Sequence, residues 1–344
     1  MTRAARLEYV LSAVLVAVIG ALLALQWLGP WDEAGELAPQ PWPVSRPAPG
    51  SVALDVTTLS LARNSFRAWE PRDLLEVNAF EQGARQHADI VMWFADWERG
   101  RFDARQARAV AERGSVPEIS WEPWDAGVGP RRAQPRYTLR SIIAGRHDAG
   151  VRRFAVAAAR YGGPVRLRFA QEMNGRWYPW SESANGNRPG EFARAWRHVH
   201  ALFAAAGATN VTWIWAPVAG GIRRSQYPGS AYVDVVGLSG FNGGGLLFRQ
   251  EWRPFPVAFG PPLDALRWLA PDKPVELAEL ASTEHGGDKA AWIREVFAEV
   301  RRRPYIGALV WFNLRKEADW RIESSPAARA AFAEGIATAR RGVR

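Results

Sequence analysis

The sequence predicts an α/β fold, a (β/α)8 TIM barrel that follows an N-terminal apolar helix and a proline-rich linker. From residue 51 onward, short apolar or β-branched runs alternate with amphipathic stretches, which indicates strands joined by helices. Eight strand candidates fit between residues 51 and 344, a length typical of this barrel. Carboxylates, amides and tryptophans follow the ends of these runs, where such a barrel carries its functional residues. A doubly wound parallel sheet is the alternative.

The eight strands and most of their connecting helices can be placed in order. We expect strands near residues 52–57, 90–95, 116–121, 165–170, 211–216, 233–239, 275–279 and 306–312. We expect helices over residues 71–86, 104–113, 149–161, 189–206, 262–269 and 289–302. Pro71, Pro189 and Pro262 lie at or near helix starts, where proline is tolerated. The fifth connection, around residues 222–230, is glycine-rich and is expected to hold no more than a turn of helix.

The N-terminal segment is a candidate membrane span. Residues 9–28 are apolar except for a serine, a glycine and a glutamine, and are long enough to cross a bilayer as a helix. Arginines precede this stretch and acidic residues follow it, so the positive-inside rule places the rest of the chain outside the cytoplasm. The alternative is a cleaved signal peptide, which would make the protein secreted. The expected divisions are a signal anchor or signal peptide, a proline-rich linker and a barrel, over residues 1–30, 31–50 and 51–344.

Composition excludes several classes of site. The chain has no cysteine, which excludes disulfides, thiolate zinc sites and cysteine nucleophiles. Its histidines show no metal-ligand spacing, so we expect no metal and no cofactor. The net charge is +9, but no basic run is interleaved with aromatic residues, so we expect no nucleic-acid partner. An anionic polysaccharide or an anionic membrane surface are the alternatives that would use this charge. We expect a monomer.

One segment carries the strongest functional signal. Residues 166–182 begin with a short apolar strand that ends at a carboxylate, Glu172. Asn174, Trp177 and Trp180 follow it within the same segment. Aromatic rings next to a carboxylate suit a site that stacks sugars and cleaves the linkage between them.

A second glutamate completes the expected site. Retaining hydrolysis of a glycosidic bond needs an acid and a nucleophilic carboxylate about 5 Å apart. Glu172 at the end of strand four and Glu279 at the end of strand seven face each other across a barrel, so we expect them to converge. The alternative is that each is a rim glutamate paired with a nearby arginine, such as Arg168.

These motifs resemble glycoside hydrolase family 26. The similarity runs over most of residues 75–335, through the segments ISWEPW, RFAQEMNGRWYPW, AWRHVHALFAAAGATNVTWIWAP, YPGSAYVDVVG, KPVELAE and VWFN. The resemblance implies a retaining (β/α)8 enzyme in which Glu172 is the general acid/base and Glu279 the nucleophile. Members cleave β-mannans, mixed-linkage β-glucans or β-xylans. We expect the substrate to contact Glu122, Trp124, Gln171, Asn174, Trp177, Trp180, Trp215, Phe241 and Trp311. For Trp311, a place in the barrel core is the alternative.

The chain departs from the family pattern at several positions. Gln171 stands where mannanases carry histidine, and Val218 where the family favours asparagine. Phe241 replaces a tyrosine that resembles the group holding the nucleophile ionised. Either another donor, Arg168 or Asn242, replaces that hydroxyl, or turnover is slow or lost. We therefore expect a membrane-tethered, exported endo-glycosidase acting on a β-linked polysaccharide; the alternative is a weakened, polysaccharide-binding relative that acts in exopolysaccharide handling.

Overall fold

The computed structural model describes residues 60–65, 73–247 and 251–341, all within the compact unit Val44–Arg344. The predicted apolar span at residues 9–28, the linker and the strand predicted at residues 52–57 lie outside these ranges. Within them, no helix has the length and apolar character needed to cross a membrane.

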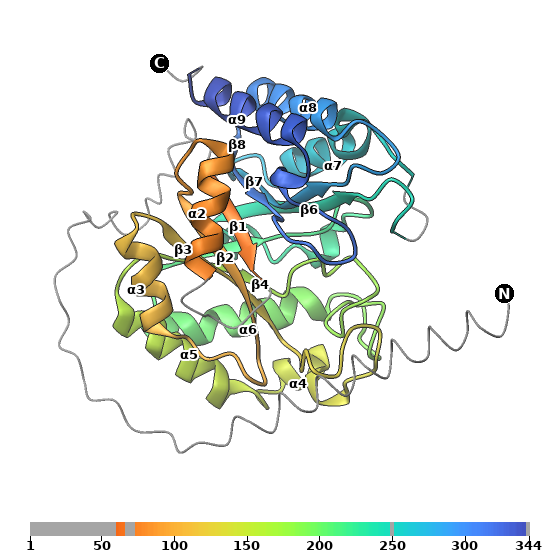
Figure 1. The fold of residues 1–344 in the computed structure, drawn as a ribbon. Helices are drawn as coiled ribbons and strands as arrows, with labels where there is room; N and C mark the ends of the chain where they lie inside the picture. The colour runs from red at the N-terminus through yellow and green to blue at the C-terminus, as the bar shows by residue number, and fades with distance from the viewer. Residues whose placement is uncertain (1–59, 66–72, 248–250, 342–344) are drawn as a thin grey trace, which may run out of the picture. The chain divides into compact units, whose positions relative to one another are not determined.

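Eight parallel strands form a closed barrel (Figure 1), in which each strand pairs with the next and β8 pairs with β1. The strands are β1 (Ser60–Ser65), β2 (Ile90–Asp96), β3 (Val116–Glu122), β4 (Val165–Phe169), β5 (Val211–Trp215), β6 (Val235–Asn242), β7 (Val275–Ser282) and β8 (Ile306–Trp311). Strands two to eight lie where the sequence predicted them, within a few residues. The first strand of the barrel lies at residues 60–65, not at the predicted residues 52–57. The barrel prediction is confirmed for this part of the chain, and the doubly wound alternative is wrong.

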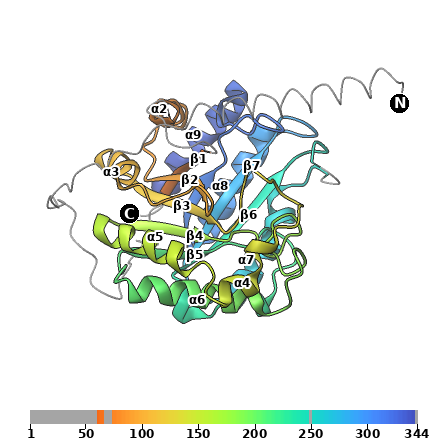
Figure 2. The same cartoon turned by 90° about the horizontal axis from the view of Figure 1, so that it is seen from below.

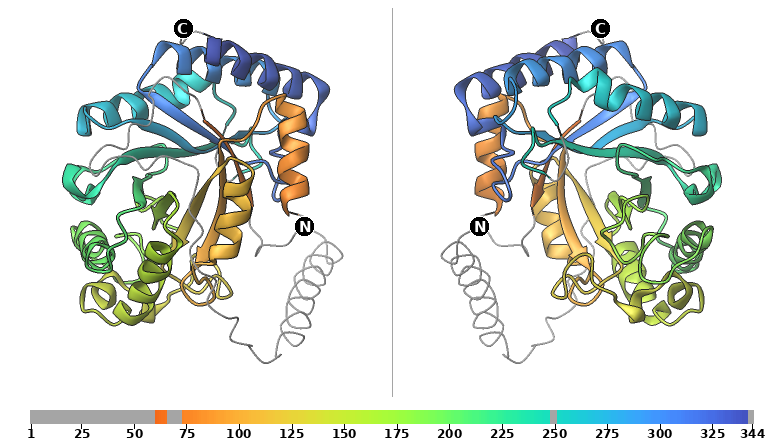
Figure 3. Two further views of the ribbon diagram at one scale, coloured as in Figure 1. Left: turned by 90° about the vertical axis from the view of Figure 1, so that its left-hand side faces the viewer. Right: turned by 90° about the vertical axis from the view of Figure 1, so that its right-hand side faces the viewer.

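Helices lie on the outside of the strands (Figures 2 and 3). They are α2 (Asp73–Ala84), α3 (Ala104–Glu112), α4 (Leu139–Ile143), α5 (Asp148–Tyr161), α6 (Glu191–Ala205), α7 (Phe255–Leu269), α8 (Lys289–Arg302) and α9 (Pro326–Arg341). Two short 3-10 turns, Arg224–Gln226 and Ser230–Tyr232, replace a helix between β5 and β6, as the glycine-rich sequence predicted.

Three helices differ from the sequence prediction, and the first is the short α4, which was not predicted. Helix α7 begins at Phe255, so Pro262 lies inside it and not at its start. The buried face formed by Phe255, Phe259, Leu263 and Leu266 has the spacing of a helix and holds it together through the prolines. Helix α9 was not predicted; it packs beside α8 and against α2 (Figure 1), with Phe332 edge-on to a ring of α2.

The barrel interior contains two apolar clusters and a group of buried charged residues from β3, β4 and β7. Strands alternate inward and outward side chains, and the inward apolar residues form two clusters. These are Ile90, Met92, Ala308 and Val310, and Ile214, Ala216, Val235 and Ala278. On β3 and β4 the inward positions carry Glu118, Arg166 and Arg168 instead, all nearly or fully buried. Arg166 donates to Glu118 at 2.9 Å and to Glu276 of β7.

Strand β7 contains one extra residue relative to β6. Gly237 aligns with Glu276, but Ser239, two residues later, aligns with Glu279, three residues later. Residues three apart on a regular strand point to opposite faces. The bulge turns both Glu276 and Glu279 into the barrel, where each binds an arginine of β4. The inward direction of Glu279 therefore follows from this irregularity.

Candidate active site

Glu172 lies in a sharp turn directly after β4. Ala170 and Glu172 have φ angles of 49° and 56°, a region that residues other than glycine rarely adopt. The Glu172 N–H donates to the Ala216 carbonyl at 2.7 Å, which ties the turn to the end of β5. Its side chain is 7% exposed, and its Oε2 accepts a hydrogen bond from Trp177 Nε1 at 2.9 Å. Backbone strain of this kind concentrates at functional sites.

Glu279 is held by an arginine inside the barrel. Arg168 Nη2 donates to Glu279 Oε2 at 2.6 Å, and Arg168 is fully buried. Arg168 is itself fixed by bonds to Ser120 Oγ at 3.1 Å and to the Ala278 carbonyl at 2.5 Å. Glu279 lies three residues before the end of β7, whereas the sequence placed it at a strand end. A pairing of Arg168 with one of the two glutamates was the alternative that the sequence left open, and it holds for Glu279.

The two glutamates differ in electrostatic surroundings. Burial raises the pKa of Glu172 to about 8, and the negative charge of Glu279 adds to the rise. Burial also raises the pKa of Glu279, but the Arg168 guanidinium opposes that rise. Glu279 accepts from a charged arginine, whereas Glu172 accepts only from a neutral indole. The negative charge of the pair therefore belongs on Glu279 and the proton on Glu172. This division of roles suits one carboxyl as acid and the other as nucleophile.

A third carboxyl lies in the same layer. Glu122, the last residue of β3, is 5% exposed and accepts hydrogen bonds from Gln171 Nε2 at 2.6 Å and Trp124 Nε1 at 3.0 Å. Burial raises the pKa of Glu122 to about 7; the two hydrogen bonds oppose this, and the charge of Glu279 adds to it. Glu122, Gln171 and Trp124 thus form one hydrogen-bonded group beside the two glutamates.

The loop after β4 is built from aromatic rings. Trp180 is fully buried, donates to the Gln171 carbonyl at 2.7 Å and stacks on Tyr178 with centroids 4.2 Å apart. Trp124 packs edge-on against both rings. Trp177 is only partly buried and reaches Glu172 directly. Of the two tryptophans predicted in this loop, Trp177 lies partly exposed beside Glu172, while Trp180 supports the loop; a contact between either ring and substrate stays a prediction.

Asn174 joins this loop to the one after β5. Its side chain donates to the Val218 and Gly220 carbonyls at 2.9 and 2.6 Å and accepts from the Val218 N–H at 2.9 Å. The amide therefore braces the backbone on which Glu172 sits. A contact between Asn174 and substrate stays a prediction.

Two predicted tryptophans are fully buried away from the glutamates. Trp215 donates to the Gln226 carbonyl at 3.1 Å and packs edge-on to Tyr227. Trp311 packs against Trp292 of α8 and Phe332 of α9, so it faces the helices. The alternation of β8, with Ala308 and Val310 inward, explains this direction.

Phe312, the next residue, points to the opposite face from Trp311 and contacts Phe241. It is 3% exposed and packs edge-on against Phe241, with centroids 5.2 Å apart. Sequence analysis missed it, although the two-residue alternation of β8 could have found it. Phe241 also packs edge-on to Trp320, so an aromatic cluster occupies the place where the family pattern has a tyrosine.

The two donors proposed to replace that tyrosine behave differently. Arg168 donates directly to Glu279, as described above. Asn242 instead donates to the Arg253 carbonyl at 2.8 Å and accepts from the Arg253 N–H at 3.2 Å. Arg168 is therefore the donor, and Asn242 fastens a loop.

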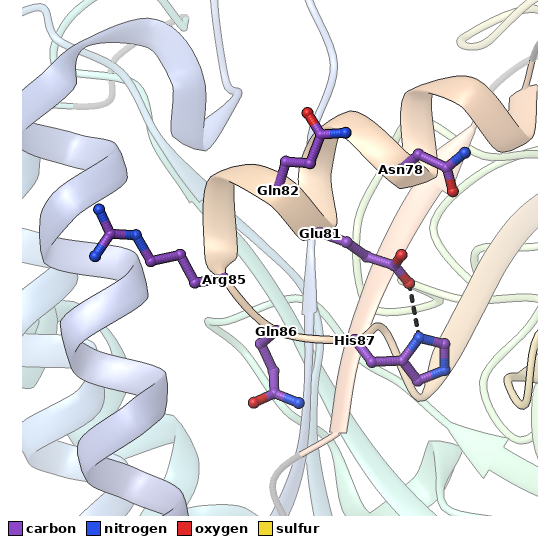
Figure 4. Close-up of a pocket in the computed structure, with 6 residues that line it drawn as sticks. All are labelled: Asn78, Glu81, Gln82, Arg85, Gln86 and His87. Carbon is purple, nitrogen blue, oxygen red and sulfur yellow. Dashed lines mark ion pairs between the residues drawn. The ribbon is translucent and has the colours of Figure 1, made fainter.

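Other candidate sites are weaker in the described residues. In these ranges, no group of three or more histidine, cysteine or acidic side chains could hold a metal. Figure 4 shows a pocket at the end of α2, lined by Asn78, Glu81, Gln82, Arg85, Gln86 and His87. Glu81 there pairs with His87 at 2.9 Å and with Arg113 at 2.8 Å. The pocket precedes β2 and thus lies at the amino ends of the strands, opposite the glutamates, where barrel residues serve stability.

Comparison with known proteins agrees with this geometry. A sequence model of glycosyl hydrolase family 26 matches residues 155–244. The chain is 35% identical over 270 residues to endoglucanase H of Acetivibrio thermocellus, covering 76% of this chain and 29% of that protein. It is 29% identical over 86 residues to a mannan endo-1,4-β-mannosidase of Bacillus subtilis, covering 23% of this chain and 24% of that protein. The chain thus spans less than a third of the length of either relative.

A solved structure shares the fold. The family 26 β-mannanase from Bacteroides ovatus superposes with a TM-score of 0.62 and 16% identity, covering 83% of this chain and 90% of that one. The resemblance to family 26 that the sequence predicted is confirmed.

Proposed function

We propose that this chain, a relative of glycosyl hydrolase family 26, is a retaining endo-glycosidase that hydrolyses a β-linked polysaccharide. The observation that carries the proposal is the unequal treatment of two buried glutamates. Arg168 bonds to Glu279 and favours its charged form, whereas burial raises the pKa of Glu172 to about 8 and keeps its proton. A pair with one proton and one charge matches the two carboxyl groups of a glycoside hydrolase, and the resemblance to family 26 supports retention.

The reaction follows from these states. The Glu279 carboxylate attacks the anomeric carbon, while Glu172 gives its proton to the oxygen of the departing sugar. This forms a covalent bond between the sugar and Glu279 and breaks the glycosidic bond. Glu172, now ionised, then takes a proton from a water molecule, whose oxygen attacks the same carbon and releases Glu279. Two inversions leave the configuration at this carbon unchanged.

The substrate is a neutral or anionic β-linked glycan of the mannan or glucan type. The names of two relatives, an endoglucanase and a mannan endo-1,4-β-mannosidase, support this range. Trp177 supports it as well, because a partly exposed indole that hydrogen-bonds the acid can stack on the sugar next to the cleaved bond.

We place the barrel outside the cytoplasm, held at the membrane by residues 9–28 as a monomer. The apolar length of that segment, with arginines before it and acidic residues after it, supports this orientation. Membrane fractionation followed by protease treatment of intact cells tests it, since an exported barrel is cleaved and a cytoplasmic one is protected.

A second candidate is a polysaccharide-binding relative with little turnover. Phe241 favours it, because no hydroxyl stands where the family pattern has tyrosine. The Arg168–Glu279 bond speaks against it, since a nucleophile with a charged donor needs no tyrosine to stay ionised.

Release of reducing ends separates the two candidates. The full chain is incubated with mannan, mixed-linkage glucan, xylan and bacterial exopolysaccharides, with Glu279→Ala and Glu172→Gln as site variants. Glu284→Gln, which changes an exposed glutamate just beyond β7, is the matched control. We expect cleavage of at least one glycan, lost in both site variants and kept in the control, with retained anomeric configuration by proton NMR. Equal release by wild type and Glu279→Ala on every glycan would exclude the hydrolase.

A further inference from the structure

A buried hydroxyl without a partner lies beside the proposed nucleophile. Ser239, on β6, is fully buried, and its Oγ has no hydrogen-bond partner among the described residues. Both backbone groups of Ser239 are hydrogen-bonded: its N–H donates to the Pro217 carbonyl, and its carbonyl accepts from the Ala219 N–H. Buried hydroxyls in native proteins are usually hydrogen-bonded, so a hydroxyl without a partner calls for an explanation, and its place beside Glu279 distinguishes Ser239.

The direction of Ser239 follows from its strand. Gly237, two residues earlier, faces the barrel interior, because a side chain there would touch Ala216 and Ala278 of the inner cluster. Residues two apart on a strand share a face, so Ser239 also points inward. Phe241, two residues later, meets Phe312 on the same side.

The bulge in β7 sets Ser239 next to Glu279. After the register shift, Ser239 and Glu279 are direct partners across the β6–β7 pair, and partners on one face have neighbouring side chains. Without the extra residue, Ser239 would lie opposite Ala278. Both the serine and the glutamate therefore face the interior at the same level.

We propose that Ser239 is a positioning residue for Glu279, and this inference rests on the proposed hydrolase function. Its hydroxyl donates to the Glu279 carboxylate after a rotation about χ1 and supplies the neutral donor that Phe241 lacks. Arg168 holds one oxygen of Glu279 from β4, and Ser239 approaches from β6. Two donors from different strands fix the plane of the carboxylate as well as its charge.

The acid limb of the pH–rate profile reports this contact. The charged and titratable groups that interact with Glu279 come from several elements: Arg168 from β4, Glu172 and Tyr178 after β4, Glu122 and Glu118 from β3, and Lys316 after β8. None of them is changed by a substitution at Ser239. A shift of the acid limb in such a variant is therefore assigned to the lost hydroxyl.

The test compares two serines that are equally buried and equally without partners. Ser239→Ala removes the proposed donor, and Ser282→Ala removes an orphan hydroxyl from the strand of Glu279, three residues further along. For Ser239→Ala in the full chain, we expect the acid limb of kcat/KM to move about one unit upward, so that kcat/KM at pH 5 falls by up to about tenfold, with KM little changed. Ser282→Ala should match wild type, and Ser239→Thr, which keeps a hydroxyl, should restore most of the rate.

Each outcome decides the inference. An unchanged acid limb in Ser239→Ala, or the same shift in both alanine variants, overturns it. A raised KM with an unchanged acid limb would show that the Ser239 hydroxyl binds the sugar and not Glu279, and this also overturns the inference. If Ser239→Ala fails to fold by tryptophan fluorescence, the near-isosteric Ser239→Cys, a weak donor, is measured instead and must show the same shift. A wild-type chain that cleaves no glycan rejects the proposed function itself, which is a different result.

Discussion

Replacing Arg168 by methionine should reveal how much the buried ion pair contributes to both folding and reactivity. Methionine keeps much of the arginine volume but provides no donor, so Glu279 loses its charged partner. Ser120 and the Ala278 carbonyl lose their donor as well. Removing one member of a buried pair costs about 3–5 kcal/mol of unfolding free energy. Each of the two neutral acceptors left unpaired contributes about 1–3 kcal/mol to the loss.

The remaining loss depends on pH. Without Arg168, the pKa of Glu279 rises further above the ordinary value of 4.5, because burial is then unopposed. Between the unfolded and folded pKa values, the folded chain binds more protons than the unfolded chain, so stability falls as pH rises. The difference between variant and wild type should therefore be smallest near pH 5 and largest near pH 7.5, growing by up to about 1.4 kcal/mol for each unit that the pKa moves.

Urea unfolding of the full chain at both pH values measures this difference, with tryptophan fluorescence as the signal. The double variant Arg168→Met/Glu279→Gln provides the control, since neither side chain then carries a charge. It should lose less stability than Arg168→Met alone at pH 7.5 and should show no extra loss between the two pH values. An equal destabilisation of Arg168→Met at pH 5 and pH 7.5 would refute the assignment of charge to Glu279.

Three further predictions concern single side chains. The rate of hydrolysis should decline above about pH 8 as Glu172 loses its proton. Trp177→Phe should move this alkaline limb to higher pH, because the indole hydrogen bond favours the ionised form of Glu172. A shift of the limb to lower pH would contradict this. Lys289→Met should lower the unfolding free energy by about 1.5–3 kcal/mol in urea melts, since the buried ammonium donates to two carbonyls and a hydroxyl in the segment after β8; an unchanged midpoint would show that these bonds contribute nothing. Gly237→Ala should lower the unfolding free energy by about 1–3 kcal/mol, because the added Cβ would lie 2.7 Å from another side-chain carbon. Gly307→Ala on β8, where a Cβ has open space, should leave the unfolding free energy nearly unchanged. Equal melting temperatures for the two variants would rule out the steric argument.

Sequence periodicity located the strands because most of them are buried on both faces and read as apolar runs. The exception is β1, whose sequence SLARNS has no such run and pairs as a strand between β2 and β8. Helix α9 was missed because its alanine-rich pattern has a weak apolar face, and it is held by packing on α8 and α2.

The site was predictable in part. Glu172 could be read from its strand end and aromatic neighbours, and Arg168 was considered as a partner for a glutamate. The directions in which the aromatic side chains at the end of β8 point could not be predicted from the sequence. Trp311 faces the helices and Phe312 faces Phe241, because Ala308 and Val310 of β8 point into the barrel. Local composition does not reveal these directions, since both aromatic residues suit either face.

The irregular pairing of β7 has a consequence for how related chains are compared. A chain with the same three-residue spacing but a regular β7, without the bulge, would turn Glu279 toward the helices, with the strand itself preserved. Such a chain would align over its whole length, still contain a glutamate, and yet have no inward carboxylate at this point. Whether a relative keeps its chemistry thus depends on whether its β7 keeps this bulge as much as on the identity of the two glutamates.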